Sequence, residues 1–195
     1  MVRQEHILEA AIKRFSHFGV SKTTLTEIAD DLSMSKQSLF YYYPDKQHLL
    51  AAVEEKITTD YINALNQAFD KAGSIESALI KLLEIKKTFF EKYFMLAAQF
   101  ISTDAITKYK QIDEVKRRLN EQEKGILAAL FEKGIASGEL QALDTEKTAG
   151  LLLDTLTAFN SCVSDRKGLP EPKDFEVLHQ KQKDVMQLFY NGLKR

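Results

Sequence analysis

Residues 35–46, which read SKQSLFYYYPDK, carry most of the side chains through which this chain could act on a partner. Three consecutive tyrosines follow a phenylalanine, and the run ends in a proline, an aspartate and a lysine. This is too much ring surface for a loop and too many hydroxyl groups for a hydrophobic core. We therefore expect some of these hydroxyls to bind a partner outside the protein.

Helical geometry determines which of these side chains can reach a partner. If a helix begins after Ser35, Leu39 marks its buried direction, and side chains on the opposite face point outwards. Tyr43 lies one turn after Leu39 and belongs to the core. The outward face and its flanks offer an ammonium, an amide, a hydroxyl and two phenols: Lys36, Gln37, Ser38, Tyr41 and Tyr42. Amides can pair with base edges, and the other groups can bind phosphates, so this face suits DNA.

Any DNA binding has to be local to this face, because the chain as a whole is not basic. It has 27 Lys and Arg against 28 Asp and Glu, which gives a net charge of -1 at pH 7. Residues 1–48 also balance their charges. This composition excludes a protein that adheres to nucleic acid through its overall charge.

Short helices should position the candidate face. Apolar residues at helical spacing predict a first helix over 7–18, and Gly19 supplies the stop that helix ends favour. The sequence TLTE at 24–27 is a capping box, which predicts the start of a second, short helix. Residues 33–34 form a tight connection, after which Ser35 can cap a third helix.

Pro44 ends that third helix, and Asp45 can cap a long fourth helix running towards Phe69. Ala29 is a small residue that lets the second and third helices cross closely, as in a helix-turn-helix. An ordinary helical hairpin uses the same apolar spacing, so periodicity alone leaves both alternatives open.

The remaining chain is predicted to be helical as well. Only 8 Gly and 3 Pro interrupt 195 residues, which is too few for the turns of a sandwich or barrel. The strongest breaks are GIASGEL at 134–140 and KGLPEP at 167–172. We therefore expect an all-α fold.

Several classes of protein are disfavoured. The single Cys162 rules out an internal disulfide and fits a reducing compartment. No apolar run approaches the roughly 20 residues of a membrane span, and no basic-then-apolar leader opens the chain, so we expect a cytoplasmic protein. The 4 His and the Cys lack metal-ligand spacing, and there is no phosphate loop or nucleophile motif. We expect no metal, no cofactor and no enzyme activity.

A combination of motifs runs in order through the amino-terminal region. It comprises the paired alanines and the phenylalanine of the first helix, Gly19, TTLTEIA at 23–29, the serine before the third helix, and LFYYYPDKQHLL at 39–50. Over about residues 3–53 the sequence thereby resembles the amino-terminal domain of the tetracycline-repressor (TetR) family of bacterial transcription regulators. The resemblance implies a three-helix helix-turn-helix domain over 1–46, joined by a long helix to a helical ligand-binding and dimerisation domain over 47–195.

The resemblance also implies DNA contacts. Thr24 would contact a phosphate at the start of the second helix, and Ser35 would stand at the head of the DNA-facing third helix. The remaining contacts would come from Lys36, Gln37 and Ser38 at the edge of the major groove, and from Tyr41, Tyr42 and Lys46 on the flanking DNA backbone.

Two positions depart from the family pattern. Ser33 stands where glycine is usual, so a left-handed backbone there would carry a modest strain cost. Phe40 stands where tyrosine is usual, which removes one hydroxyl contact.

In this family the later helices enclose a cavity for a small molecule, and two of them pair with their copies in a dimer. The matching segments here lie at about 120–136 and 146–165. The candidate residues for the dimer seam are Leu127, Leu130, Phe131, Leu152, Leu156 and Phe159. The alternative is that these residues form the core of a single chain.

The aromatic-rich stretch KKTFFEKYFMLAAQF at 86–100 could line a pocket for an apolar or aromatic effector. The candidate pocket residues are Phe90, Tyr93, Phe94 and Phe100, together with Phe159. A stripe of rings at helical spacing is also what an ordinary core shows.

These observations favour a homodimeric regulator of a double-stranded DNA operator, most simply a repressor that a small-molecule effector releases. The alternatives are a helical adaptor that binds only protein and an enzyme. The polar outward face of the third helix disfavours the adaptor, and the absence of catalytic motifs disfavours the enzyme.

Overall fold

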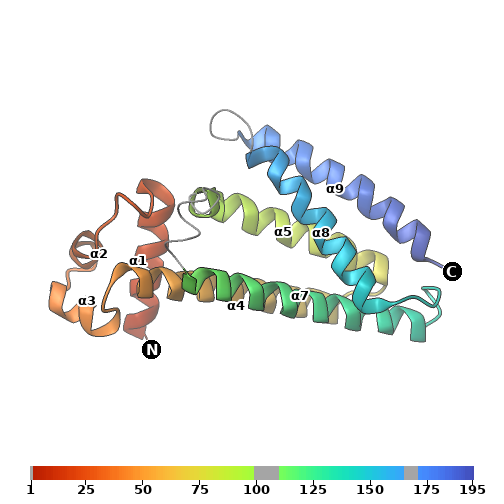
Figure 1. Ribbon diagram of the computed structural model, residues 1–195, viewed down its shortest axis with the longest axis horizontal. Coiled ribbons are helices and arrows are strands. Elements are labelled where there is room, and N and C mark those ends of the chain that lie inside the picture. Colours follow the sequence, from red (N-terminus) through yellow and green to blue (C-terminus); the bar gives the residue numbers. More distant parts are fainter. Residues whose placement is uncertain (1, 99–109, 165–170) are drawn as a thin grey trace. The chain divides into compact units, whose positions relative to one another are not determined.

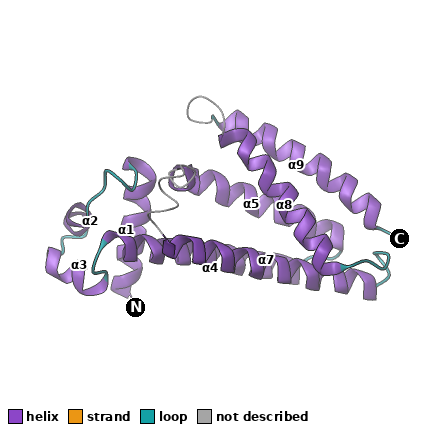
Figure 2. Cartoon of the chain, viewed as in Figure 1, coloured by secondary structure: helices purple, strands orange, loops and turns teal. Residues whose placement is uncertain are grey.

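The computed structural model describes residues 2–98, 110–164 and 171–195 (Figure 1). Its helices are α1 (Val2–Phe18), α2 (Leu25–Asp31), α3 (Lys36–Tyr42), α4 (Lys46–Asp70), α5 (Ile75–Ala98), α7 (Lys110–Ala136), α8 (Thr145–Ser164) and α9 (Pro172–Leu193). Within these ranges the only extended pairing is an isolated antiparallel bridge between Leu140 and Lys194, and Figure 2 shows helices and loops alone. The predicted all-α class is confirmed.

One of two compact units comprises the described residues of Met1–Asp60 and of Lys92–Arg118. It contains the three short helices and the first part of α4. Its core is apolar and includes Ile7, Ala11, Phe15, Ile28, Ala29, Leu39, Tyr43, Leu49, Leu50 and Val53. Leu39 is fully buried and Tyr43 is nearly so, as the helical geometry of the third helix predicted.

Local signals in the sequence account for the helix ends in this unit. Gly19 has φ 88°, and its N–H donates to the carbonyl of Phe15 at 3.1 Å, which closes the end of α1. At the start of α4, Asp45 Oδ1 accepts a hydrogen bond from His48 N at 2.9 Å. Asp45 is therefore the helix cap that the sequence predicted, and this hydrogen bond lowers the pKa of its carboxyl.

The second unit comprises the described residues of Tyr61–Glu91 and of Leu119–Arg195. In it, α8 and α9 lie side by side (Figure 1). Its core includes Leu65, Ile75, Leu79, Leu82, Leu83, Leu127, Leu130, Phe131, Ala149, Leu152 and Leu156. At Gly134 an added Cβ would lie 2.8 Å from side-chain atoms of Ile75 and Leu140, so close packing requires a glycine near the end of α7.

Helices α4, α5 and α7 each contribute residues to both units. The predicted division at residues 46 and 47 concerns function rather than packing, and it stays a prediction.

Candidate nucleic-acid interface

The start of α2 is fixed by the capping box that the sequence predicted. Thr24 Oγ1 accepts a hydrogen bond from Glu27 N at 3.2 Å, while Thr24 N donates to Glu27 Oε2 at 2.7 Å. The Thr24 hydroxyl also donates a hydrogen bond to Glu27 Oε2 at 2.8 Å. These bonds lower the pKa of Glu27. The hydroxyl proton of Thr24 is therefore already donated to Glu27. The Thr24 side chain is nevertheless exposed, so a phosphate could approach it.

The cap of α3 arranges two more of the candidate residues. Ser35 Oγ accepts a hydrogen bond from Ser38 N at 3.1 Å, and the two hydroxyl oxygens lie 2.8 Å apart. Lys36 and Gln37 in the first turn are exposed. The buried Leu39 fixes the rotation of α3, so the amide of Gln37 lies on the solvent side.

The tyrosine run divides as expected between core and surface. Tyr41 is 85% exposed, Tyr42 is half-buried against the core of its unit, and Tyr43 is buried. The rings of Tyr41 and Tyr42 meet edge to face, with centroids 5.5 Å apart. Lys36 Nζ lies 5.4 Å from the ring centroid of Phe40. The face therefore combines two phenol groups with an ammonium held near an aromatic ring.

Lys46 has intramolecular partners that the sequence did not predict. Its Nζ donates to the carbonyl oxygens of Val20 at 2.9 Å, Thr23 at 3.0 Å and Ser21 at 3.4 Å. The Thr23 hydroxyl donates to Gly19 O at 2.8 Å within the same loop. Lys46 therefore ties the loop that precedes α2 to the head of α4, and contact with DNA phosphate stays a prediction.

The turn between α2 and α3 shows the strain expected at Ser33. Its φ is 50°, and within the described residues it is the only non-glycine residue with a positive φ. Ser33 N donates to Asp30 O at 3.0 Å, and Met34 N donates to Ala29 O at 2.9 Å. The turn is thus closed by backbone hydrogen bonds around a left-handed serine.

Ion pairs that join α1 to α2 were not predicted from the sequence. Arg14 makes a bidentate contact with Asp31, at 2.5 Å from Nε and 2.8 Å from Nη2, and its Nη1 lies 3.5 Å from Glu27 Oε1. The hydrogen bond from Arg14 lowers the pKa of Asp31. The guanidinium also lies 5.4 Å from the ring centroid of Phe18. The charges of these residues did not indicate the ion pair in the sequence, because Asp31 is 17 positions from Arg14.

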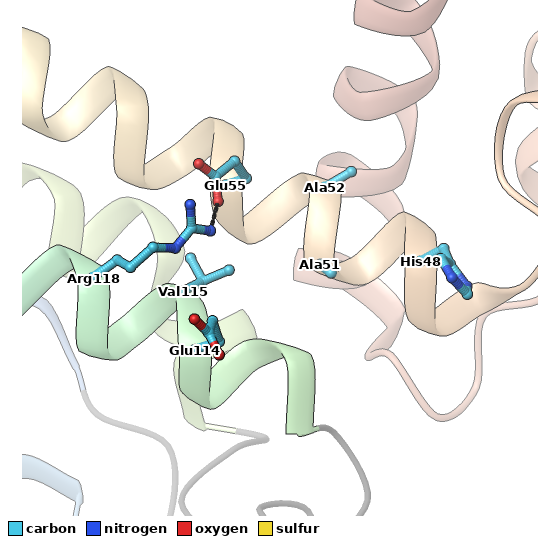
Figure 3. A pocket seen from close by; sticks show the side chains of 7 residues that line it. All are labelled: His48, Ala51, Ala52, Glu55, Glu114, Val115 and Arg118. Atoms are coloured by element: carbon cyan, nitrogen blue, oxygen red, sulfur yellow. Dashed lines mark hydrogen bonds and ion pairs between the residues drawn. The ribbon is translucent and has the colours of Figure 1, made fainter.

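A surface groove of about 610 Å³ lies between α4 and α7 in the same unit (Figure 3). Ala51, Ala52 and Val115 form its apolar part, and the other lining residues are His48, Glu55, Glu114 and Arg118. Arg118 Nη2 donates to Glu55 Oε2 at 2.5 Å, which joins the two helices. The first turns of α4, which follow α3 in the chain, are therefore linked to α7.

None of the predicted pocket residues that the structure describes lines this groove. Tyr93 and Phe94 are buried in the first unit, whereas Phe90 and Phe159 are half-buried in the second. Phe90 meets Phe175 edge to face, with ring centroids 5.6 Å apart. Phe100 lies outside the described residues. A second cavity of about 250 Å³ lies between α5 and α9 and is lined by other residues, among them Leu79, Leu83 and Met186.

Five of the six residues suggested for the dimer seam belong to the core of a single chain. Leu127, Leu130, Phe131, Leu152 and Leu156 are buried without any partner chain. Of the two alternatives that the sequence left open, burial favours the core of a single chain for these five residues. Apolar side chains that remain exposed on α8 and α9 are Leu151 (54%), Val177 (50%) and Leu188 (72%).

Neither a metal-binding cluster nor a membrane-spanning helix is found within the described residues. They contain no group of three or more His, Cys, Asp or Glu placed to hold a metal ion. Among the described helices, none is long and apolar enough to cross a membrane.

The chain is similar to known transcription regulators. Residues 7–53 match the family model of bacterial regulatory proteins, tetR family. The chain is 26% identical over 159 residues to the HTH-type transcriptional regulator YhgD of Bacillus subtilis (strain 168), covering 77% of this chain and 78% of that protein. It is 25% identical over 159 residues to the HTH-type transcriptional repressor KstR2 of Mycolicibacterium smegmatis, covering 78% and 75%.

The fold matches that of a solved regulator over its whole length. A crystal structure of a transcriptional regulator from Cytophaga hutchinsonii superposes with a TM-score of 0.88 at 24% identity and covers 100% of both chains. The all-α fold of this chain therefore has a counterpart among solved structures.

Proposed function

We propose that this chain, a DNA-binding transcriptional regulator that belongs to the TetR family of bacterial regulatory proteins, acts as a homodimeric repressor released from its operator by a small-molecule effector. The relatives that it matches are named as regulators, and one of them as a repressor. Their names give no support to an enzyme.

The single observation that carries the contact assignment is the rotation of α3. Leu39 is fully buried, while Lys36, Gln37 and Tyr41 are exposed. A short helix with its polar side outward can enter the major groove, with its first turn at the base edges. In this proposal Gln37 reads bases, whereas Tyr41 and Tyr42 hold the flanking phosphates.

A dimer supplies the contact area with DNA that one short helix lacks. A helix of 7 residues reads few bases, and two half-sites together give the contact area of a specific complex. The exposed apolar side chains of α8 and α9, Leu151, Val177 and Leu188, fit a contact with a second copy. We place the dimer contact there.

The effector would act through α4. This helix begins two residues after Pro44 and contributes to the cores of both units. An effector that binds one arrangement of the helices better than the other shifts the population towards it and changes DNA affinity. The aromatic side chains Phe90 and Phe159 in the second unit are our candidates for contact with the apolar or aromatic body of the effector.

A gel-shift titration tests the proposed function. The probe is a duplex from the region upstream of the protein's own coding sequence, compared with a scrambled duplex of equal composition. We expect the native duplex to be preferred, with affinity falling steeply between about 50 and 200 mM salt. Equal affinity for both duplexes would contradict the proposal, and no binding to either duplex would favour the helical adaptor that binds only protein.

A further inference from the structure

Three ionisable side chains converge inside the apolar core of the second unit. The hydroxyl of Tyr61 on α4 donates to Glu123 Oε1 on α7, and Lys86 Nζ on α5 lies 2.6 Å from the same oxygen. Tyr61 and Glu123 are buried. Burial and the charge of Glu123 raise the pKa of Tyr61 well above its ordinary value, so the phenol stays protonated and donates.

One aromatic ring lies beside the Lys86 ammonium, and a second ring packs against the first. Its Nζ lies 5.5 Å from the ring centroid of Tyr61. Phe89 meets the ring of Tyr61 edge to face at 5.3 Å between centroids. A cation thus faces both a buried carboxylate and a π-system, which are the two features that proteins combine to bind organic cations.

The cluster is not explained by stability. A buried ion pair loses much of its attraction to desolvation, and apolar residues of similar size usually serve a core as well. The two partners also differ in accessibility, since the side chain of Glu123 is 5% exposed and that of Lys86 is 21% exposed. The carboxylate is fixed, whereas the ammonium sits on a flexible stem that reaches solvent.

We propose that Tyr61, Phe89 and Glu123 form a recognition site for the positively charged group of an organic amine or quaternary ammonium ligand, and that Lys86 occupies this site until such a ligand displaces it. The inference rests on the proposed effector function and extends it by assigning a charge to the ligand. An anionic ligand fits less well, because it would meet the negative charge of Glu123 and because Lys86 is already neutralised.

The site also suggests how the ligand would be sensed. Tyr61 belongs to α4, Lys86 to α5 and Glu123 to α7, so one ligand would replace the charge contact that joins three helices. Displacement of Lys86 removes the ion pair between α5 and α7, while the ligand keeps Glu123 neutralised. The exchange therefore distinguishes an empty arrangement from a liganded one within this unit.

Isothermal titration calorimetry of the full chain tests the proposal. The probes are benzyltrimethylammonium as the cation, benzyl alcohol as the neutral compound and phenylacetate as the anion. We expect the wild type to prefer the cation. Lys86→Met removes the competing ammonium but keeps a long apolar stem, so it should bind the cation about tenfold more tightly than the wild type.

Two further variants separate recognition from folding. Lys86→Met combined with Glu123→Gln leaves no unpaired buried charge, so it should fold, and it should not distinguish the cation from benzyl alcohol. Tyr61→Phe keeps the ring and loses the hydroxyl, so its cation affinity should stay within about threefold of the wild type.

Several outcomes would overturn the proposal. These are a preference of the wild type for phenylacetate, no binding of the cation to Lys86→Met, or equal cation affinity of Lys86→Met and the double variant. Operator binding of the unliganded protein is measured separately by gel shift. Failure of the cation to bind while operator binding persists contradicts this inference alone, whereas loss of operator binding contradicts the proposed function alone.

Discussion

At the scale of single residues, the DNA contacts proposed for α3 are of two kinds, and substitutions at them should have different effects. The amide of Gln37 can pair bidentately with adenine, so Gln37→Ala should cost roughly 1–3 kcal/mol on the preferred operator and much less on altered sites. Tyr42→Phe keeps the half-buried ring packed and loses one hydroxyl, so it should weaken all sequences alike by about 1 kcal/mol. The measurement is the affinity of each variant for a panel of operator mutants. The assignment of the two faces is wrong if Gln37→Ala lowers every affinity equally while Tyr42→Phe changes the preferred base.

The left-handed backbone at Ser33 gives a second prediction at this scale. A side chain at φ 50° is strained, and glycine removes that strain at some entropic cost. Ser33→Gly should therefore raise the free energy of unfolding by about 0.5–1 kcal/mol, as measured by urea denaturation. Ser21→Gly in the loop before α2 is the matched control, because Ser21 has no positive φ, and it should lower stability slightly. A Ser33→Gly variant less stable than wild type would mean that the serine side chain stabilises the turn.

Much of this residue-level picture could be predicted from the sequence, because it depends on local geometry. The capping box at Thr24, the cap at Ser35 and the inward turn of Tyr43 each involve groups within four positions of one another. The partners of Lys46 and Arg14 were not predictable in this way. Asp31 lies 17 positions from Arg14, and Val20 lies 26 positions from Lys46, so these contacts depend on the path of the loop between α1 and α2.

At the scale of helices, Lys46 anchors the loop before α2 to the head of α4. Lys46→Met removes hydrogen bonds to three carbonyl oxygens, so the free energy of unfolding should fall by about 1–3 kcal/mol in urea denaturation. Lys22→Met, an exposed change in the same loop with the same loss of charge, should leave stability nearly unchanged. Equal stability of Lys46→Met and wild type would contradict the anchor.

The salt dependence of DNA binding separates the anchor from a phosphate contact at Lys46. If the ammonium also neutralises a phosphate, Lys46→Met should reduce the slope of log affinity against log salt by about one per half-site. If Lys46 acts only by holding the loop, affinity falls but the slope stays unchanged. A gel-shift series with this variant decides between the two roles.

The helices themselves were predictable, but whether an apolar face of the later helices packs within one chain or against a second chain was not. The core of one chain and the seam between two chains both require apolar residues at helical spacing, so the sequence could not distinguish Leu127 or Leu156 from true seam residues. Burial in the single chain makes the distinction. Leu188 and the other exposed apolar residues lie at positions that periodicity alone did not distinguish as candidates for a contact between two chains.

At the scale of the whole molecule, the proposed function depends on two copies of α3 that bind DNA together. Light scattering at micromolar concentration should give about twice the chain mass of 22.2 kDa. Leu188→Glu places a charge at the most exposed apolar side chain of α9, where it would be buried in the proposed dimer contact at a high desolvation cost. We therefore expect this variant to scatter as a monomer and to bind the operator at least about tenfold more weakly, because a monomer engages only one half-site.

Asn120→Glu on α7 makes the same change of charge at an exposed polar position, and it should remain dimeric. Thermal melting should show both variants folded, since neither side chain lies in the core. A Leu188→Glu variant that stays dimeric and binds the operator as tightly as wild type would place the dimer contact elsewhere on the chain.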